Sequence, residues 1–195
     1  MSRSTIVFID AGFLSKLSKY LGGEEGYLKF DIIQLSYLIA KKENLKLELI
    51  YYYTAPPFIS NSPSTEEKKR KENYDKFVNR ITKNDIIQLK EGRCQRIKEN
   101  GIFVYNQKGV DNLLTIDLIE VSFKFPKIKH VILIACDTDF IPAINNAYTK
   151  GIKTILYTYF DRNRTSNFSR SNELLQNVEK YQLITKEDLK NSKFN

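Results

Sequence analysis

The chain has 195 residues, enough for one domain with a substantial core, and its 42% hydrophobic and 28% charged residues are usual for a globular protein. No apolar run reaches the roughly 18 residues that a membrane-spanning helix needs, and the first ten residues lack the pattern of a secretory signal. Two cysteines, Cys94 and Cys136, are too few for a disulfide framework and fit a reducing compartment. We therefore expect a soluble, cytoplasmic protein.

The formal net charge is +8, from 31 Lys and Arg residues against 23 Asp and Glu residues. Eleven basic and six acidic residues fall between Glu66 and Lys98, which gives this stretch a local net charge of +5. A basic field of this kind attracts polyanions such as nucleic acids. The alternative is that these charges only solvate the outer face of a helix.

Strand and helix patterns alternate along the first part of the chain. Residues 4–10 predict a short buried strand, and the residues that follow have the apolar spacing of a helix. Asp31 can cap a second helix. Residues 45–54 predict a second strand, which Pro56 and Pro57 end because proline cannot donate to the sheet.

The middle of the chain predicts a charged helix followed by a hairpin. Ser64 and Glu67 match a capping box at the start of this helix, and its single apolar stripe predicts that it packs on the body of the protein. Residues 85–98 and 101–106 have the pattern of two hairpin strands. We therefore expect a basic helix-hairpin insertion at about residues 60–106, which could also form a homodimer contact.

The second half of the chain continues the alternation. It predicts a helix from about Gly109, a very apolar strand over 131–136, a helix over 140–148, a strand over 153–159, a polar basic loop over 161–170, a final helix over 173–179 and a short strand over 182–185. Apolar strands alternating with helices predict an α/β fold, with a mostly parallel sheet covered by helices on both faces. The sequence has no internal repeat and no long linker, so we expect one domain over residues 1–195.

Acidic residues stand where predicted strands end. Asp10 ends the first strand and Asp137 follows a later one, so both are expected at the carboxyl edge of one parallel sheet, where ligands bind. Asp139 is two residues further on, and Asp111 lies in the first turn of a helix. Clustered carboxylates repel one another unless a cation neutralises them, and their oxygens suit hard cations such as Mg²⁺. Because a metal held in this way can activate water against a phosphodiester, the pattern predicts phosphoryl transfer or hydrolysis.

Several of these residues also have a structural interpretation. Asp10 and Asp137 could cap the helices that follow them, and Asp111 could simply favour a helix N-terminus. Asp117 lies on the apolar face of its helix, where a buried carboxylate needs a partner. We interpret Asp117 as structural support, and the alternative is that it is an outer member of the site. His130 precedes a strand and is interpreted as structural rather than as a general base.

Three segments of the sequence together resemble the NYN domain, in particular its LabA-like branch (DUF88), within the PIN-like nuclease superfamily. The segments are Phe8-Ile9-Asp10-Ala11-Gly12-Phe13-Leu14, Lys108-Gly109-Val110-Asp111 and Leu133-Ile134-Ala135-Cys136-Asp137-Thr138-Asp139-Phe140-Ile141-Pro142. The resemblance covers most of the chain and implies a Rossmann-like, PIN-like sheet and an Mg²⁺- or Mn²⁺-dependent ribonuclease. By motif match, it implies that Asp10, Asp111, Asp137 and Asp139 bind the metal and carry out catalysis.

Four residues are candidates for substrate contact. Thr138 stands where the family often has serine, and its hydroxyl could hold a water or a phosphate oxygen. Lys108 could contact a phosphate or be a solvated lysine. Arg162 and Arg164, with Arg170 nearby, lie in a loop just past the end of a strand, where basic side chains can contact phosphates.

The sequence also departs from the family pattern. Ala11, Gly12 and Phe13 follow Asp10, where many NYN proteins have an asparagine, and Ala135-Cys136 replaces a common Ser-Gly. These changes keep the acids but remove polar groups that position water or substrate.

The leading hypothesis is a metal-dependent endoribonuclease that acts on single-stranded or structured RNA. One alternative is a catalytically weak or inactive module that binds RNA and regulates. Another is a phosphatase of the haloacid dehalogenase type, which a strand followed by Asp137-Thr138-Asp139 also suggests.

Overall fold

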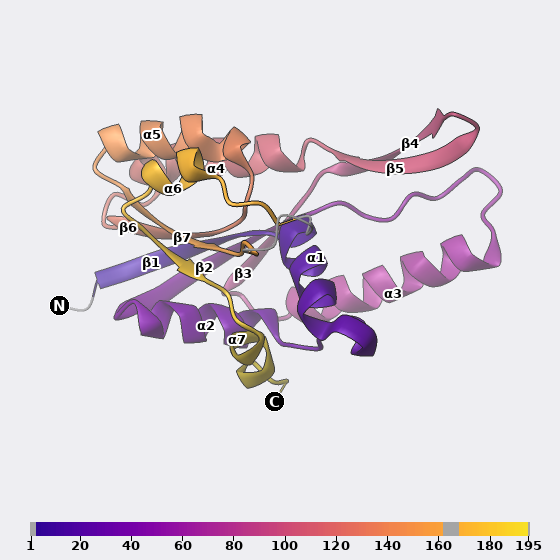
Figure 1. Cartoon of the computed structure of the whole chain (residues 1–195), viewed down its shortest axis with the longest axis horizontal. Helices are drawn as coiled ribbons and strands as arrows, with labels where there is room; N and C mark the ends of the chain where they lie inside the picture. The colour runs from indigo at the N-terminus through magenta and orange to yellow at the C-terminus, as the bar shows by residue number, and fades with distance from the viewer. Residues whose placement is uncertain (1–2, 162–167, 195) are drawn as a thin grey trace.

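A six-stranded parallel sheet forms the centre of the computed structural model, which describes residues 3–161 and 168–194 (Figure 1). Its strands are β1 (Arg3–Asp10), β2 (Leu45–Thr54), β3 (Ile87–Glu91), β6 (His130–Ile134), β7 (Lys153–Thr158) and β8 (Lys180–Leu183). Each neighbouring pair runs parallel. The apolar runs that the sequence shows belong to strands buried on both faces, so the predicted α/β fold is confirmed.

The order of strands across the sheet is β3-β2-β1-β6-β7-β8. From β1 the chain builds outward through β2 and β3, and it then returns to add β6 on the other side of β1. The direction of strand addition therefore reverses between β1 and β6. Ligands of open α/β sheets bind beyond the carboxyl ends of the strands at such a switch point, and this is where Asp10 and Asp137 stand.

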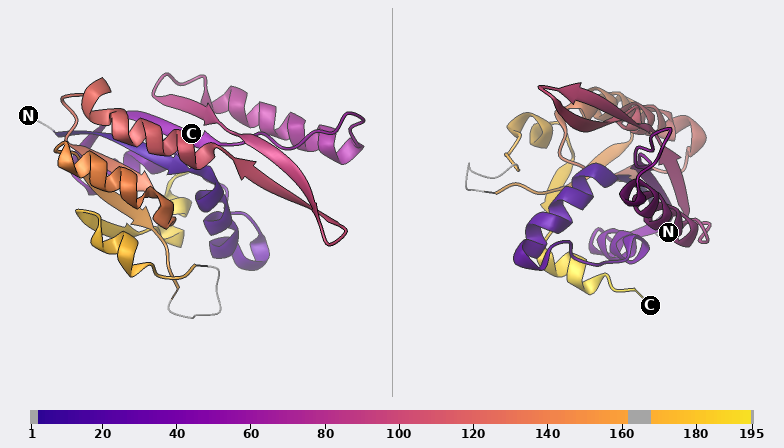
Figure 2. Two further views of the ribbon diagram at one scale, coloured as in Figure 1. Left: turned by 90° about the horizontal axis from the view of Figure 1, so that it is seen from above. Right: turned by 90° about the vertical axis from the view of Figure 1, so that its right-hand side faces the viewer.

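Helices cover both faces of this sheet (Figure 2). One face packs against α1 (Ala11–Gly22), α2 (Ile32–Lys42), α3 (Thr65–Ile81) and α7 (Lys186–Asn191). The other packs against α4 (Val110–Lys124), α5 (Ile141–Thr149) and α6 (Asn172–Gln176). Two short 3-10 helices, η1 (Gly23–Glu25) and η2 (Thr138–Phe140), complete the described elements. Side chains alternate between the two cores along β1, because successive residues of a strand point to opposite faces.

The helices begin at the capping residues that the sequence predicts. Asp31 accepts a hydrogen bond from the N–H of Gln34 at 2.9 Å and so caps α2. Ser64 and Glu67 form both hydrogen bonds of a capping box at the start of α3. These local interactions fix where the two helices begin.

The predicted hairpin is wrong in its first strand. Residues 87–91 form β3, which joins the main sheet beside β2, so α3 is a crossover between two strands of that sheet rather than part of an insertion. The hairpin consists of β4 (Arg93–Glu99) and β5 (Ile102–Lys108), and it extends outward from the carboxyl edge of the sheet (Figure 1). Gly92 lies at the break, and a Cβ there would be only 2.5 Å from the carbonyl oxygen of Lys108. Only glycine allows this close backbone approach.

The C-terminal part also differs from the prediction. The helix predicted over 173–179 ends at Gln176, and the short strand is β8 rather than residues 182–185. A further helix, α7, follows and packs against α1 and α2. Asp188 of α7 pairs with Lys42, and the carbonyl of Ser192 accepts a hydrogen bond from the N–H of Asp31 at 2.7 Å.

Candidate active site

Asp10 ends β1 and at the same time begins α1. Its Oδ1 accepts hydrogen bonds from the N–H groups of Gly12 (2.9 Å) and Phe13 (3.2 Å), which caps the helix. Both bonds use Oδ1, so among the described residues the other oxygen of Asp10 is left for a ligand. The structural and the functional interpretations of Asp10 are therefore compatible.

Asp137 stands at the same edge, three residues after the end of β6. Its Oδ1 accepts a hydrogen bond from the N–H of Asp139 at 3.0 Å and so caps η2. Asp137, Thr138 and Asp139 are all exposed to solvent. A hydroxyl and two carboxylates are thus presented together beyond the carboxyl end of β6.

Asp111 reaches this edge from the hairpin. It lies in the first turn of α4, directly after the chain turns out of β5 at Gly109. Gly109 has a φ of 82°, a left-handed conformation that glycine adopts without the steric cost of a Cβ. The turn at Gly109 therefore determines where Asp111 lies.

Asp111 is the acid that links the predicted acids electrostatically. Burial raises the pKa of Asp111, and the negative charges of Asp137 and Asp139 raise it further. Burial also raises the pKa of Asp10, with a further contribution from Asp111, while the Gly12 and Phe13 N–H groups and Lys16 act in the opposite direction. Such repulsion favours the binding of a cation between the carboxylates. Asp111 thus stands electrostatically between Asp10 on one side and Asp137 and Asp139 on the other.

The donor atoms of this group suit a hard divalent cation that keeps much of its water. Among the described residues, no three His, Cys, Asp or Glu side chains converge into a ready-made metal site. Mg²⁺ does not require such convergence, because it usually takes one or two carboxylates and completes its shell with water and substrate phosphate. Cys136 is adjacent, but burial and the charges of Asp10 and Asp137 raise the pKa of its thiol to about 11. The thiol is therefore harder to ionise than that of a free cysteine, and its soft sulfur suits a hard cation such as Mg²⁺ poorly.

A cleft of about 790 Å³ opens beside two of these acids, Asp10 and Asp137. Asp10, Cys136 and Asp137 line it from the sheet edge, and α1 contributes Lys16 and Lys19 from its exposed face. Sequence reasoning missed both lysines. The signal that could have found them is their spacing on the polar face of the helix that Asp10 begins.

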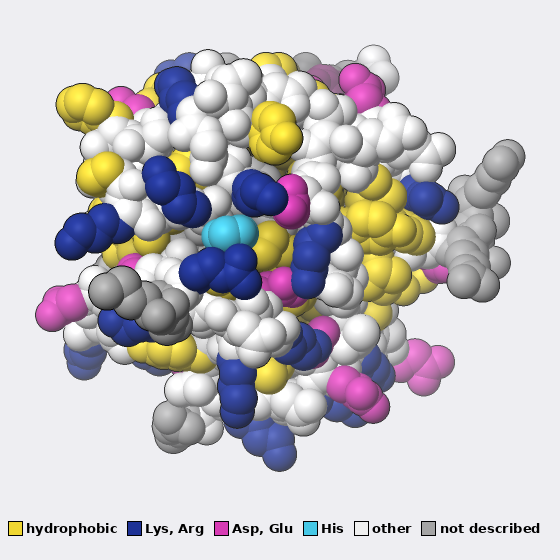
Figure 3. All heavy atoms as spheres, turned by 90° about the vertical axis from the view of Figure 1, so that its left-hand side faces the viewer, with side chains coloured by type: hydrophobic (Ala, Val, Ile, Leu, Met, Phe, Trp, Pro, Cys, Tyr) yellow, Lys and Arg dark blue, Asp and Glu magenta, His cyan; other side chains and the backbone are white. Residues whose placement is uncertain are grey.

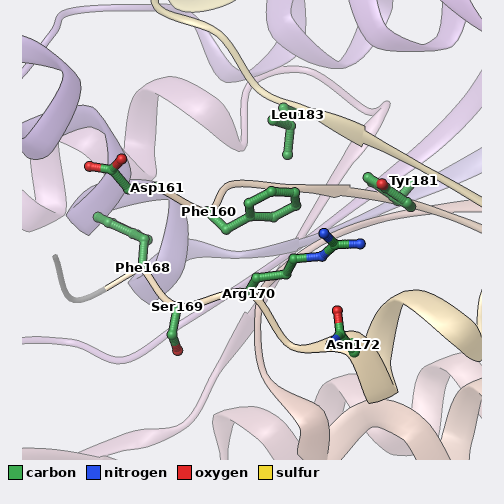
Figure 4. Close-up of a pocket in the computed structure, with 8 residues that line it drawn as sticks. All are labelled: Phe160, Asp161, Phe168, Ser169, Arg170, Asn172, Tyr181 and Leu183. Carbon is green, nitrogen blue, oxygen red and sulfur yellow. The ribbon is translucent and has the colours of Figure 1, made fainter. Parts of the chain in front are cut away.

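A neighbouring cavity of about 900 Å³ shares the Phe168 wall with the cleft. Figure 4 shows its lining, in which Arg170 extends past the Phe160 ring toward Tyr181 of β8. The guanidinium of Arg170 lies 5.4 Å from the centroid of the Phe160 ring. Of the predicted phosphate contacts, Arg162 and Arg164 lie outside the described residues, whereas Arg170 lines this cavity beside the cleft.

A family model for the NYN domain matches residues 4–182, which is most of the chain. The chain belongs to the NYN domain family. NYN domains are part of the PIN-like nuclease superfamily, and the matched segment contains all four acids. No curated protein and no solved structure matches the chain significantly. Membership in this family leaves the phosphatase interpretation without support.

Gln107 of this NYN domain lies beside the candidate site, although the sequence motifs do not reveal it. A Cβ on Gly12 would lie 3.6 Å from Oε1 of Gln107 and 3.2 Å from Oδ1 of Asp10. The end of β5 thus brings a polar amide to the turn after Asp10, where Ala11, Gly12 and Phe13 supply no polar side chain. The next residue of β5 is Lys108, which is exposed and stands three residues before Asp111.

Asp117 of the NYN domain lies in a buried polar network. Its Oδ2 accepts a hydrogen bond from the Tyr53 hydroxyl at 3.1 Å and lies 3.3 Å from Nζ of Lys90, and its Oδ1 lies 3.4 Å from Nζ of Lys124. These partners link α4 to β2 and β3. A carboxylate that is only 6% exposed is therefore compensated by surrounding donors.

His130 lies at the opposite end of β6 from Asp137, on a face where Lys and Arg side chains surround the histidine (Figure 3). Burial and the nearby charges of Arg3 and Lys153 lower the pKa of His130, against a smaller contribution from Glu179. A side chain at the amino end of the strand cannot act as a base on a substrate held at the carboxyl end.

Among the described residues, no helix of the NYN domain is long and apolar enough to cross a membrane.

Proposed function

We propose that this NYN domain is a metal-dependent ribonuclease that hydrolyses RNA phosphodiester bonds beside Asp10, Asp111, Asp137 and Asp139. The observation that supports this proposal is the electrostatic coupling of these acids at the switch point of the sheet. Four carboxylates at one edge are costly for the fold alone, and a divalent cation with a phosphodiester substrate accounts for them.

The roles of individual residues follow from their positions. Asp10, Asp111, Asp137 and Asp139 would hold Mg²⁺ or Mn²⁺, directly or through water. When bound, the metal supplies an activated water and stabilises the charge that develops on the phosphate. The Thr138 hydroxyl can hold a water or a phosphate oxygen in place.

Basic side chains around the acids would bind the RNA backbone. Lys16 and Lys19 line the cleft on one side, and Arg170 lines the adjoining cavity. Lys108 stands at the end of β5, and we keep Arg162 and Arg164 as further candidates. Positive charge on both sides of a carboxylate centre would hold a strand across the site.

We further propose that the protein belongs to the LabA-like branch, forms one domain over residues 1–195 and works in the cytoplasm. The three matching motifs support the branch. In the structure Cys94 and Cys136 are free thiols, which fits a reducing compartment.

The test is cleavage of a mixed, end-labelled RNA pool with Mg²⁺ or Mn²⁺. Asp137→Asn should lower the cleavage rate at least about 100-fold, because the removal of one group that stabilises the transition-state charge typically slows a reaction by this factor. Asp85→Asn is a matched control, since Asp85 is exposed and remote from the edge, and it should cut normally. Circular dichroism and a denaturation curve check that both variants fold. Full activity in Asp137→Asn would exclude the assignment.

A catalytically weak or inactive RNA-binding module is the second candidate. It is favoured by the absence of a polar side chain directly after Asp10 and by the lack of three converging ligands among the described residues. RNA binding that needs no metal, with no cleavage of any RNA in Mg²⁺ or Mn²⁺, would support it.

A further inference from the structure

One face of the β4–β5 hairpin carries a row of side chains that ends at the candidate active site. Cross-strand partners in an antiparallel pair project from the same face, and the register pairs Lys98 with Phe103, Arg96 with Tyr105, and Cys94 with Gln107. Phe103, Tyr105 and Gln107 therefore form one row, with about 7 Å between successive members. Because Gln107 lies beside Gly12 and Asp10, the row leads from the hairpin tip to the carboxylates.

Both rings in this row are exposed to solvent. Phe103 is 51% and Tyr105 is 44% accessible to solvent. Aromatic side chains that serve only a core are buried on average, and this hairpin has no core of its own. Two large rings exposed in one row, unlike a single exposed ring, form an open aromatic surface of the kind that contacts another molecule.

Contacts within the protein hold these rings in place. The guanidinium of Arg96 lies 4.5 Å from the centroid of Phe103 and 4.6 Å from that of Phe58. Phe58 in turn contacts Tyr105, with ring centroids 5.9 Å apart, and Arg70 of α3 lies 5.9 Å from the same tyrosine ring. The rings are thus arranged before any ligand binds, which lowers the entropy cost of binding.

The charge around the rings indicates which kind of partner fits. The hairpin contains Arg93, Arg96, Lys98 and Lys108 against the single acid Glu99. In a symmetric dimer formed by this face, two hairpins of the same positive charge would meet and repel. Exposed rings among cations instead suit a polyanion with unpaired bases, because a base can stack on an aromatic ring only when it is free of a duplex.

We propose that this face of the hairpin binds single-stranded RNA by stacking unpaired bases on Phe103 and Tyr105, and that it leads the strand to the acids. Arg96 and Lys98 contact the adjoining phosphates, and the Gln107 amide contacts the nucleotide next to Asp10. The direction of the strand rests on the proposed nuclease function, whereas the binding needs neither metal nor cleavage.

The first experiment measures the affinity for a fluorescent single-stranded oligouridylate of roughly 12 nucleotides, within the usual site size, by anisotropy with EDTA present. The double variant Phe103→Ala/Tyr105→Ala should bind at least about 5-fold more weakly, the lower limit for the loss of one stacked base. Phe103→Leu/Tyr105→Leu keeps apolar bulk and should lose affinity in the same way, which separates ring stacking from unfolding.

Two matched controls come from the same protein. Ile102 is 70% exposed on the opposite face of the hairpin, and Phe123 is 88% exposed on α4. Ile102→Ala and Phe123→Ala should both bind the oligonucleotide as tightly as the wild type. Unchanged affinity in both ring variants, or an equal loss in the controls, would overturn the proposal.

An abasic strand of the same length separates stacking from charge. The wild type should prefer the strand with bases, and the ring variants should bind both strands alike. If the ring variants lose the same factor on the abasic strand, the rings do not act by stacking and the proposal is wrong. If they change the oligomeric state in sedimentation and leave the RNA affinity unaltered, the face is an interface between copies and the proposal is equally wrong.

The outcome is independent of the nuclease assignment. A protein that binds through the rings but cuts no RNA retains the hairpin function and loses the proposed catalysis. A protein that cuts RNA with unchanged affinity in the ring variants retains the catalysis and loses the hairpin function.

Discussion

Asp10 divides its two carboxylate oxygens between the fold and the site. Oδ1 accepts the two N–H groups that start α1, so the position of this side chain is fixed by the helix that it caps. Gly12 donates one of these bonds and has no side chain of its own between Asp10 and Gln107. The position of the Asp10 carboxylate therefore depends on Gly12, a residue that takes no part in the proposed chemistry.

Gly12→Ala should separate activity from stability. The added Cβ would lie 3.2 Å from Oδ1 of Asp10, which forces the carboxylate to shift by a few tenths of an ångström. We expect cleavage to fall about 10-fold or more, since small displacements of reacting groups are costly. The free energy of unfolding should stay equal or rise by up to about 1 kcal/mol, because alanine favours a helix more than glycine does. Rates and urea denaturation are compared with those of Ser15→Ala, an exposed position on the same helix, and an undiminished rate in Gly12→Ala would contradict the expectation.

At the residue scale, the acids could be predicted and their surroundings could not. Asp10 and Asp137 follow apolar strands in the sequence, so their place at the sheet edge is a local property that periodicity reveals. Lys16 and Gln107 reach the same edge from a helix face and from a hairpin strand. Helical spacing places Lys16 on the polar face of α1, but only tertiary packing brings that face and the end of β5 to the acids, and no sequence motif encodes this packing.

The junction between β5 and α4 joins the hairpin to the site. Gly109 occupies the left-handed region at this junction, and Asp111 follows two residues later. The hairpin tip offers a natural comparison, because Gly101 has nearly the same conformation, with a φ of 84°. Neither glycine has any atom within 4 Å of where a Cβ would stand, so replacing either one introduces backbone strain and nothing else.

Gly109→Ala and Gly101→Ala should each lower the free energy of unfolding by about 1–2 kcal/mol, the cost of a left-handed conformation for an L-residue. Only Gly109→Ala should also slow cleavage, since relaxation of the strain at this junction displaces Asp111. Urea denaturation measures the loss of stability that is expected in both variants. Cleavage rates at a fixed metal concentration measure the loss of activity that is expected only in Gly109→Ala. Equal rates in the two variants would mean that the junction does not position the acid.

At the element scale, the sequence predicts which segments form strands more reliably than it predicts their partners. Residues 85–98 alternate like a single strand, yet they divide at Gly92 between the main sheet and the hairpin. Alternation reveals the two faces of a strand but not the strand beside it. The starts of α2 and α3 were predicted correctly, because Asp31, Ser64 and Glu67 form their caps with residues three positions away.

The last helix, α7, packs against the body of the protein and lies beyond the segment matched to the NYN family. Asp188 of α7 accepts hydrogen bonds from Thr185 in a capping box and pairs with Lys42 at the end of α2. Burial raises the pKa of Asp188, but the hydrogen bonds from Lys42 and Thr185 outweigh it, so the pKa lies below its ordinary value of 3.8. The ionised carboxylate is thus part of what holds the last helix on the body.

Asp188→Asn should lower the free energy of unfolding by about 1–2 kcal/mol at neutral pH, through the loss of the charged cap and the ion pair. A lowered pKa stabilises the fold above 3.8, and this stability is lost as the pH falls through the folded-state pKa. The difference in the free energy of unfolding between variant and wild type should therefore become smaller as the pH falls below 3.8. Denaturation curves from neutral pH into the acid range test this expectation. The control variant Asp85→Asn should show no such dependence on pH. A difference that is the same at all pH values would show that the charge of Asp188 plays no part.

The acids of the candidate site come from residues 10, 111 and 137–139, and β1 acquires its neighbour β6 only after more than half of the chain has been made. A ribosome delivers the chain from its N-terminus, so the basic helix and the hairpin emerge before the last carboxylates. The carboxylates can therefore meet only after β6 has been made and has paired with β1. The order of the strands thus delays completion of the candidate site until the second half of the chain has been synthesised.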